Sequence, residues 1–364
     1  MPADSPAPIS VADYERLAEG VLEPGAHAYY AGGAGDELTL SENVAAWRRL
    51  AIRPRVLLGA GSCDPAVTLL GQPRPHPLVI APMAFQRLAH PEAEIATARA
   101  AAATGTVFCI STFANTSIPV LAEAAPGAGR WFQLYVFKDR GISRELVAQA
   151  AAHGFEALVI TVDLPVVGVR ERELRWPVEV EHDADLIQHA QMVRTSELTP
   201  AEIAEQTDPD LRWADIEAFA GDTPLPVVVK GVLAPEDAIL AAEHGARGVV
   251  VSNHGGRQLD TVIAAVDALG AIVEAAGDRL EILVDGGIRR GTDVLKALAL
   301  GARAVLVGRP VLWGLSVGGE AGVRSVLELL VAEFETALAL SGAIRASDLD
   351  PSFLVRPGRV GPGP

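Results

Sequence analysis

Short apolar runs that close on polar residues recur along the chain, and alanine-rich amphipathic stretches lie between them. The eight runs begin at Leu78, Val107, Trp131, Ala157, Pro226, Gly248, Glu281 and Ala304. Runs of this length and β-branched content are typical of strands that are buried on both faces of a sheet. The helix candidates between them share an ending on glycine, and they cover 91–105, 143–154, 234–245 and 291–301.

The alternation of eight strands with helices predicts an α/β fold, a parallel (β/α)8 TIM barrel. An open doubly wound sheet is the alternative, but it needs a topological switch and usually has fewer units. We expect one domain over residues 1–364, with an N-terminal helical segment over 1–70 and the barrel over 78–342.

One interval between strands is much longer than the others, because the fourth run begins at Ala157 and the fifth at Pro226. The charge-rich segment over about 175–215 follows the end of the fourth strand. We therefore expect this insertion to lie over the mouth of the barrel as a mobile lid. The alternative is a solvated surface excursion that has no role in binding.

Net charge, apolar stretches and cysteine content limit the binding partners and the cellular location that we expect. A formal net charge of −16 argues against a general nucleic-acid-binding protein, which needs a basic surface. The apolar stretches are too short for the ~20 residues of a membrane span, and the first residues, MPADSPAPIS, do not resemble a signal peptide. Cys63 and Cys109 are the only cysteines, which excludes a disulfide framework and makes a reducing cytoplasm the expected location.

The polar ends of the strands are the candidate site, because chemistry in such barrels is expected at the carboxyl ends of the strands. In chain order the residues that close the runs are Pro82, Met83, Ala84, Ser111, Phe113, Gln133, Tyr135, Thr161, Asp163, Arg170, Lys230, Ser252, His254, Arg257, Asp285, Gly287, Arg289, Gly308 and Arg309. The loops after the last two strands, 285–291 and 308–310, contain the glycine and arginine that commonly hold a phosphate there. A phosphorylated cofactor or substrate is implied.

The sixth run ends in an unusual polar sequence, VVVSNHGGRQLD over 249–260. A histidine is suited to accept a proton near neutral pH, which makes His254 a candidate general base. A guanidinium binds a carboxylate through planar, bidentate hydrogen bonds, so Arg257 is a candidate anion clamp. The two glycines between these side chains let the backbone turn sharply.

Together these residues resemble the FMN-dependent 2-hydroxy acid oxidase and dehydrogenase family, which includes glycolate-, lactate- and mandelate-oxidising enzymes. The similarity runs from about Tyr29 to Pro310 through the motifs YYAGGAGDELTLSEN, APMAFQRLAHPE, FQLYVFKDR, TVDLPVVGVRE, VVVKG, SNHGGRQLD, DGGIRRGTDVLKALALGA and VGRP. The resemblance implies FMN as the cofactor, no metal, and oxidation of an (S)-2-hydroxy acid to the 2-oxo acid. It also implies a homo-oligomer, commonly a tetramer.

The resemblance extends to the roles of individual residues. It makes His254 the base, Asp163 the carboxylate that stabilises the imidazolium, and Lys230 the positive charge beside the reduced flavin. The implied substrate contacts are Tyr29, Phe113, Tyr135, Arg170 and Arg257. The implied partners of the flavin ring are Pro82, Met83, Ala84, Ser111, Gln133, Thr161 and Ser252, and those of the ribityl chain and phosphate are Asp285, Gly287, Arg289, Gly308 and Arg309.

The side chains around this site also bear on the substrate and the electron acceptor. Phe113 provides an aromatic wall without a polar tip. Met83, Val166 and Val167 add apolar side chains, so we expect a mandelate-like or larger aliphatic hydroxy acid rather than glycolate. Ala84 resembles the oxidases, which favours O2 as the acceptor and H2O2 as a product. The alternatives are a soluble FMN-dependent dehydrogenase with another acceptor and a flavin-free barrel enzyme that binds a phosphorylated substrate.

Overall fold

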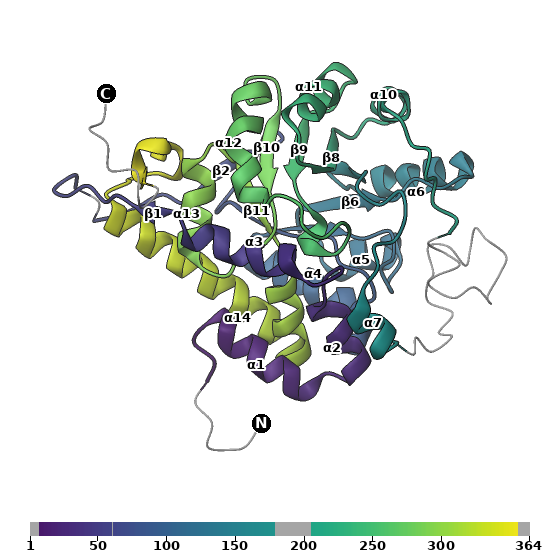
Figure 1. The fold of residues 1–364 in the computed structure, drawn as a ribbon, viewed down its shortest axis with the longest axis horizontal. Helices are drawn as coiled ribbons and strands as arrows, with labels where there is room; N and C mark the ends of the chain where they lie inside the picture. Colours follow the sequence, from purple (N-terminus) through teal and green to yellow (C-terminus); the bar gives the residue numbers. More distant parts are fainter. Residues whose placement is uncertain (1–6, 60, 179–204, 356–364) are drawn as a thin grey trace.

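The computed structural model describes residues 7–59, 61–178 and 205–355, and its centre is a closed barrel of eight parallel strands (Figure 1). The strands follow one another around the barrel in chain order: β4 (Leu78–Ile80), β5 (Val107–Ile110), β6 (Arg130–Leu134), β7 (Ala157–Thr161), β8 (Val227–Val232), β9 (Gly248–Val251), β10 (Glu281–Val284) and β11 (Ala304–Val307). Pairing of Val305 with Leu78 and of Val307 with Ile80 closes the ring. The predicted (β/α)8 barrel is confirmed, and each strand begins within one residue of its predicted run.

Helices surround the barrel and return the chain to the start of the next strand. They are α4 (Ala93–Thr104), α5 (Ile118–Ala124), α6 (Arg140–Ala152), α7 (Glu171–Arg175), α10 (Trp213–Asp222), α11 (Pro235–Glu243), α12 (Ala265–Ala276), α13 (Gly291–Ala299) and α14 (Arg309–Ser341). Short 3-10 turns occur at η1 (Gln86–Leu88), η2 (His254–Gly256), η3 (Ala346–Asp348) and η4 (Pro351–Phe353). The described residues contain no helix that is both long and apolar enough to cross a membrane.

Three helices precede the barrel, namely α1 (Val11–Val21), α2 (Pro24–Ala31) and α3 (Leu38–Arg48). α1 packs along α14, and α2 lies against α7 in the lower part of Figure 1. Two antiparallel pairs complete the fold: β2 (Val67–Leu69) with β3 (Gln72–Arg74), and β1 (Ala51–Ile52) with β12 (Leu354–Val355). The N-terminal segment thus wraps the outside of the barrel before the first barrel strand begins.

Alternate residues of each barrel strand point inward, because side chains along a strand alternate between its two faces. The buried inward set is apolar and consists of Val79, Ala81, Val107, Cys109, Trp131, Ala157, Val159, Val228, Val250, Leu283, Ala304 and Leu306, with Leu69 of the β2–β3 hairpin packed against it. Two residues further along the same faces stand Ser111, Gln133, Thr161, Lys230, Ser252, Asp285 and Gly308. The inward face of the strands therefore changes from apolar to polar at their carboxyl ends.

The long interval between β7 and β8 begins with α7 and ends with α10. From Glu205 onward the chain lies against the loop after β6, where Lys138 N–H donates to the Gln206 carbonyl at 2.9 Å and Asp208 N–H donates to the Val136 carbonyl at 2.8 Å. The C-terminal flank of the predicted lid is thus attached to the loop that follows the carboxyl end of β6. The central part of the predicted lid, residues 179–204, lies outside the described residues.

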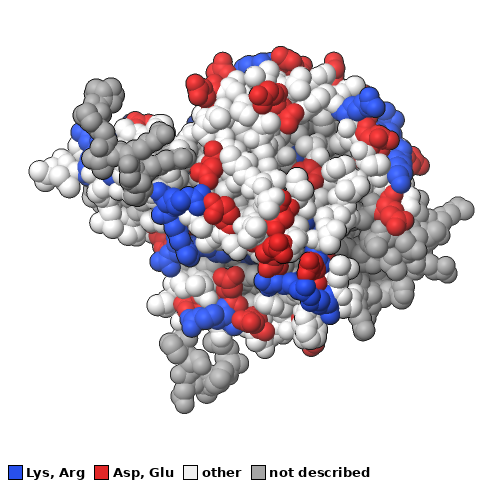
Figure 2. Space-filling model, in the orientation of Figure 1, with Lys and Arg blue, Asp and Glu red and all other residues white. Residues whose placement is uncertain are grey.

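Charged side chains are interspersed on the face that Figure 2 shows, where arginine and lysine alternate with aspartate and glutamate in small groups. On that face the coloured residues of the described chain form no continuous basic surface. The mixed distribution on this face accompanies the formal net charge of −16.

Candidate active site

His254 lies at the carboxyl end of β9, in the turn η2. The φ angles of His254, Gly255 and Gly256 are 58°, 63° and 76°, a region that glycine enters without steric cost. Two side chains hold this turn: the Ser252 hydroxyl accepts from the His254 backbone N–H at 3.0 Å, and the Asn253 amide oxygen accepts from the Gly256 N–H at 3.2 Å. The end of the strand therefore fixes the imidazole at the mouth of the barrel.

The imidazole of His254 lies between Asp163 and Tyr135. Its Nδ1 is 2.9 Å from Oδ1 of Asp163, so Nδ1 is the donor, and Nε2 is left as the acceptor 3.4 Å from the Tyr135 hydroxyl. Burial lowers the pKa of His254 below its usual value, although Asp163 acts to raise it. Burial would raise the pKa of Asp163, but His254 and Lys230 leave it lowered. A neutral imidazole beside an ionised carboxylate can accept a proton at Nε2.

The structure also brings Arg170 and Arg257 together at this mouth. One carboxylate oxygen of Glu173 lies 3.3 Å from Arg170 Nη1 and 3.1 Å from Arg257 Nη2. Arg257 further donates to the backbone carbonyls of Tyr29 and Gly32, and Nε of Arg170 donates to the Arg257 carbonyl at 3.0 Å. Burial and the charge of Arg170 lower the pKa of Arg257, yet guanidinium remains a cation in proteins. Two oriented cations at one position form a site for a carboxylate.

Four aromatic rings form a row on one side of the mouth. The ring centroids are 5.8 Å apart for Tyr29 and Phe85, 6.2 Å for Phe85 and Phe113, and 5.1 Å for Phe113 and Tyr135. Cζ of Arg257 lies 4.9 Å from the Tyr29 centroid, within the range of a cation–π contact. Burial raises the pKa of both tyrosines, so each keeps its phenol proton. This side of the site is apolar, with phenol hydroxyls at its ends.

Lys230 is the one positive side chain on the inward face of the described strand ends. Its Nζ donates to the Ser252 hydroxyl at 2.9 Å and lies 3.1 Å from Oδ2 of Asp285. Burial would lower the pKa of Lys230, but the carboxylates of Asp285 and Asp163 raise it above its usual value. The Lys230 ammonium therefore keeps its positive charge at the carboxyl end of β8, inside the barrel mouth.

Polar atoms without a partner identify the space in front of Lys230 as a binding site. Among the described residues, Nε2 of Gln133, Oδ1 of Asp285 and Oδ2 of Asp163 are buried and make no hydrogen bond. Such atoms are costly unless a ligand or water satisfies them. Thr161 and Ser111 line the same inward face and are buried, and the Ser111 hydroxyl accepts from the backbone N–H of Phe113 at 3.1 Å. Donors, acceptors and a cation around one space fit the hydrogen-bonding groups of FMN.

The loops after β10 and β11 lead into α13 and α14 at the mouth. The first backbone N–H groups of α13 already donate to carboxylates, Arg289 and Arg290 to Asp293 and Gly291 to Glu333, so the N-terminus of α14 is the candidate anion site. α13 follows Gly287 and Arg289, and α14 begins at Arg309 after Gly308. The N–H groups of Gly308 and Arg309 precede the first helical hydrogen bond, which Val311 makes, and such N–H groups bind phosphate. Arg289 is half-buried, and desolvation lowers the pKa of its guanidinium. This arrangement fits a phosphate group.

The guanidinium of Arg309 lies against the N-terminal segment and the turn η2. It donates to three backbone carbonyls, those of Tyr30 at 2.8 Å, Gly32 at 2.8 Å and Gly255 at 3.0 Å. The side chain therefore ties the N-terminal segment to the turn that carries His254. The sequence could not show this, because the three carbonyls lie far from Arg309 in the chain.

Pro82, Met83 and Ala84 follow β4, and each is half-buried. Met83 lies beside the end of β11, because a Cβ on Gly308 would be 3.7 Å from the Met83 sulfur. Val166 and Val167, expected in an apolar pocket, are 72% and 53% exposed among the described residues. They do not form a buried wall there; the aromatic row supplies the apolar side.

Three further residues of the site were missed from the sequence. Phe85 directly follows Ala84, and its aromatic character next to a strand end was a usable signal. Glu173 follows Arg170 by one helical turn, but no local pattern shows that it reaches Arg257. Asn43 exchanges two hydrogen bonds of 2.8 Å with Asn253, which attaches α3 to the turn before His254.

Comparison with known proteins identifies the family. Residues 18–356 match the model of the family described as FMN-dependent dehydrogenase. The chain is 48% identical to an L-lactate oxidase of Nostoc sp., covering 96% of this chain and 98% of that protein. It is 43% identical to a glycolate oxidase of Spinacia oleracea, covering 95% of each. A solved mandelate oxidase variant with (S)-mandelic acid is 41% identical with a TM-score of 0.87, covering 96% of this chain and 98% of that chain.

The polar ring at the mouth and these matches agree on one cofactor. The unpartnered buried atoms, the Lys230 cation and the N-terminus of α14 are groups that a phosphorylated flavin requires. The match spans nearly the whole chain rather than a single motif. The chain therefore belongs to the FMN-dependent dehydrogenase family, and its cofactor is FMN.

Proposed function

We propose that the protein oxidises (S)-2-hydroxy acids to 2-oxo acids, with FMN as cofactor and O2 as the final electron acceptor. In the overall reaction R–CH(OH)–COO⁻ and O2 give R–CO–COO⁻ and H2O2. The observation that carries this proposal is the position of a base, Nε2 of His254, near the anion site of Arg170 and Arg257, since the charge of Arg170 acts on the His254 imidazole. A 2-hydroxy acid carries a hydroxyl proton and a carboxylate on the same carbon, which suits this pair of sites.

His254 takes the proton from the substrate hydroxyl. Its Nδ1 is held by Asp163, so the proton arrives at Nε2, and the ionised carboxylate stabilises the imidazolium that forms. The Tyr135 hydroxyl, 3.4 Å from Nε2, keeps its proton and donates a hydrogen bond to the substrate oxygen. The three side chains thus act at one oxygen atom of the substrate.

The arginines orient the substrate so that its α-carbon faces the space in front of Lys230. They bind the carboxylate, while the Tyr29 ring packs against the guanidinium of Arg257. FMN, when bound, supplies the acceptor for the two electrons and the hydrogen that leave the α-carbon. Lys230, held by Asp285, keeps a positive charge on that side, where negative charge increases during the reaction.

We propose Gln133, Ser111, Thr161, Ser252 and the strand-end residues Pro82, Met83 and Ala84 as the surroundings of the flavin ring. Asp285 would take the ribityl chain, and the backbone of Gly287, Gly308 and Arg309 with the side chain of Arg289 would take the phosphate. The unpartnered Gln133 amide and Asp285 oxygen support this assignment. We also propose that the N-terminal segment and the barrel form one functional domain, since Tyr29 comes from the former and His254 from the latter.

The side chain of the preferred substrate follows from the aromatic row. Phe85 and Phe113 stack with an interplanar angle of 7°, and Phe113 and Tyr135 with 24°. Such a surface favours an aromatic or branched aliphatic group over the hydrogen of glycolate. We therefore propose a mandelate-like or larger aliphatic 2-hydroxy acid as the substrate.

Oxygen as the acceptor is supported by Ala84 and by the relatives that the chain matches, which carry the names of oxidases. The alternative is a dehydrogenase that passes electrons to another acceptor. A flavin-free barrel enzyme has no support, because the family is FMN-dependent.

The test is anaerobic mixing of the FMN-loaded protein with (S)-mandelate, (S)-lactate and glycolate while flavin absorbance is followed. We expect bleaching, fastest with mandelate, and rapid recovery with H2O2 release when air is admitted. Failure of all three acids to bleach the flavin would refute the reaction class. Bleaching followed by slow recovery in air would replace the oxidase with a dehydrogenase, and fastest turnover of glycolate would refute the substrate preference.

A further inference from the structure

Glu173 is a third charged member of the anion site. Its Oε1 contacts both guanidiniums, at 3.3 Å from Arg170 Nη1 and 3.1 Å from Arg257 Nη2. The Glu173 side chain is 23% exposed, and those of Arg170 and Arg257 are 10% and 14% exposed. A carboxylate that two nearly buried cations share at one oxygen is part of their arrangement and differs from an exposed surface ion pair.

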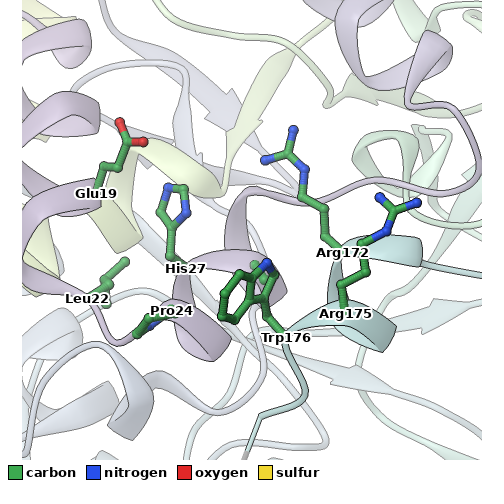
Figure 3. Close-up of a pocket in the computed structure, with 8 residues that line it drawn as sticks. Glu19, Leu22, Pro24, His27, Arg172, Arg175 and Trp176 are labelled. Atoms are coloured by element: carbon green, nitrogen blue, oxygen red, sulfur yellow. The ribbon is translucent and has the colours of Figure 1, made fainter.

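Glu173 and the two arginines beside it in α7, Arg172 and Arg175, point in different directions. Arg172, Arg175 and Trp176 have the i, i+3, i+4 spacing of one helical face, and they line an open pocket together with residues of α1 and α2 (Figure 3). Glu173 lies between these positions in sequence and points to the barrel instead, where it meets the arginines. Glu171 pairs with Arg175 on the exposed side. The helix thus presents one carboxylate to the site and keeps another outside it.

The other hydrogen bonds of the arginines fix where the substrate can bind. Six of the ten guanidinium N–H groups have acceptors among the described residues: Tyr29, Gly32 and Glu173 for Arg257, and Arg257, Gln258 and Glu173 for Arg170. The remaining four equal the number of acceptor positions that one carboxylate offers. Glu173 therefore holds the two cations in place and leaves donors for a single carboxylate.

The charges of this cluster then limit the substrate. Two guanidiniums and one carboxylate carry a net charge of +1, which one substrate carboxylate neutralises. A second carboxylate on the substrate would add a negative charge that no remaining positive charge of this cluster balances, and the charge of Glu173 would repel it. We propose that Glu173 is a specificity-determining residue that restricts the site to 2-hydroxy monocarboxylates and disfavours dicarboxylates. This inference deepens the proposed function and rests on it for the placement of the substrate.

The experiment compares two five-carbon 2-oxo acids, 2-oxovalerate with one carboxylate and 2-oxoglutarate with two. Both are 2-oxo acids, like the reaction product, so they bind without being oxidised. Their dissociation constants can be measured by titrating the oxidised holoenzyme and following its flavin absorbance. The variant Glu173→Gln keeps an oxygen that can accept from both arginines and removes only the charge. Glu173→Asp keeps the charge, and Glu171→Gln makes the same charge change on the same helix outside the site.

We expect the wild type to bind 2-oxovalerate about tenfold more tightly than 2-oxoglutarate, the size of effect that one charge exerts at close range in a partly buried site. Glu173→Gln should abolish this preference, whereas Glu173→Asp and Glu171→Gln should keep it. An unchanged preference in Glu173→Gln would refute the inference. Tighter binding of both ligands by the same factor would also refute it, because Glu173 would then only compete with the substrate.

The two proposals fail in different ways. If no 2-hydroxy acid bleaches the wild-type flavin but the 2-oxo acids bind with the expected preference, the proposed function is wrong, and only the discrimination by Glu173 between mono- and dicarboxylates stands. If a 2-hydroxy acid bleaches the flavin and Glu173→Gln leaves the ligand preference unchanged, only the role of Glu173 is wrong.

Discussion

Nδ1 of His254 and Oδ1 of Asp163 lie 2.9 Å apart although the residues are 91 positions apart in the chain. β7 and β9 bring them together, with β8 between. The contact leaves one imidazole nitrogen facing the substrate site and places a charge behind the ring. The pH dependence of the enzyme should follow from this pair.

The first prediction concerns that pH dependence. His254 must be neutral to accept a proton, and burial lowers its pKa, so kcat/KM should fall only as the pH drops below the usual histidine range. Asp163 acts to raise the pKa of His254, so Asp163→Asn should move this acid limb to still lower pH. The same variant should lower kcat about 100-fold, because the imidazolium loses its counter-charge.

A pH profile of kcat/KM for both proteins checks this prediction. Tyr135 should not contribute to the alkaline limb, since burial and Asp163 raise its pKa far above the working range. Tyr135→Phe therefore serves as the control, with reduced activity and an unchanged acid limb. A shift of the acid limb of Asp163→Asn to higher pH would contradict the assigned geometry.

The second prediction concerns Lys230 and Asp285, whose charged atoms lie 3.1 Å apart in the barrel. Lys230→Met would leave Asp285 buried without its partner, and breaking a buried pair costs about 3–5 kcal/mol. The free energy of unfolding of the FMN-free protein in urea should fall by that amount. The double variant with Asp285→Asn should recover much of the loss, and Lys138→Met, at an exposed lysine, should have little effect. Equal losses in the single and double variants would show that the pair is not coupled.

How far the site could be predicted from the sequence depends on how local each signal is. The polar ends of the strands could be identified because residues two positions apart lie on the same face of a strand. Thr161 therefore shares the face of Val159, and Lys230 shares the face of Val228. Glu173 and the guanidinium of Arg309 act on partners far away in the chain, Arg257 and Gly32. Their contacts depend on how α7 and the N-terminal segment pack onto the barrel, which no local pattern contains.

The third prediction tests the aromatic row. Phe113→Ala removes the ring that stacks on both Phe85 and Tyr135, and such contacts are worth about 0.5–1.5 kcal/mol beyond the area they bury. A contact of the same kind between this ring and the phenyl group of mandelate, which glycolate lacks, would make the ratio of kcat/KM for mandelate over glycolate fall by about two- to tenfold. Val166→Ala, at a side chain that is 72% exposed, is the matched control and should leave the ratio unchanged. An equal effect of Phe113→Ala on both substrates would place this ring away from the substrate side chain.

The fourth prediction uses two neighbouring glycines after β10. Gly286 and Gly287 have φ angles of 89° and 79°, so alanine would be strained at either position. A Cβ at Gly287 would lie 2.0 Å from the backbone oxygen of Asn43 in α3, whereas at Gly286 the nearest atom of Asn43 is 3.4 Å away. Gly287→Ala must therefore displace α3 as well as strain the loop.

We expect Gly287→Ala to lower the free energy of unfolding by about 1–3 kcal/mol more than Gly286→Ala, the usual cost of forcing an extra carbon into a packed region. It should also weaken FMN binding more, because α3 is attached through Asn43 to Asn253, next to His254. Urea denaturation and FMN titration of the two variants measure both effects. The two substitutions share the backbone strain, and only Gly287→Ala adds a clash with the Asn43 backbone. Equal losses of unfolding free energy and of FMN affinity would mean that α3 does not need Gly287 to pack on the loop after β10.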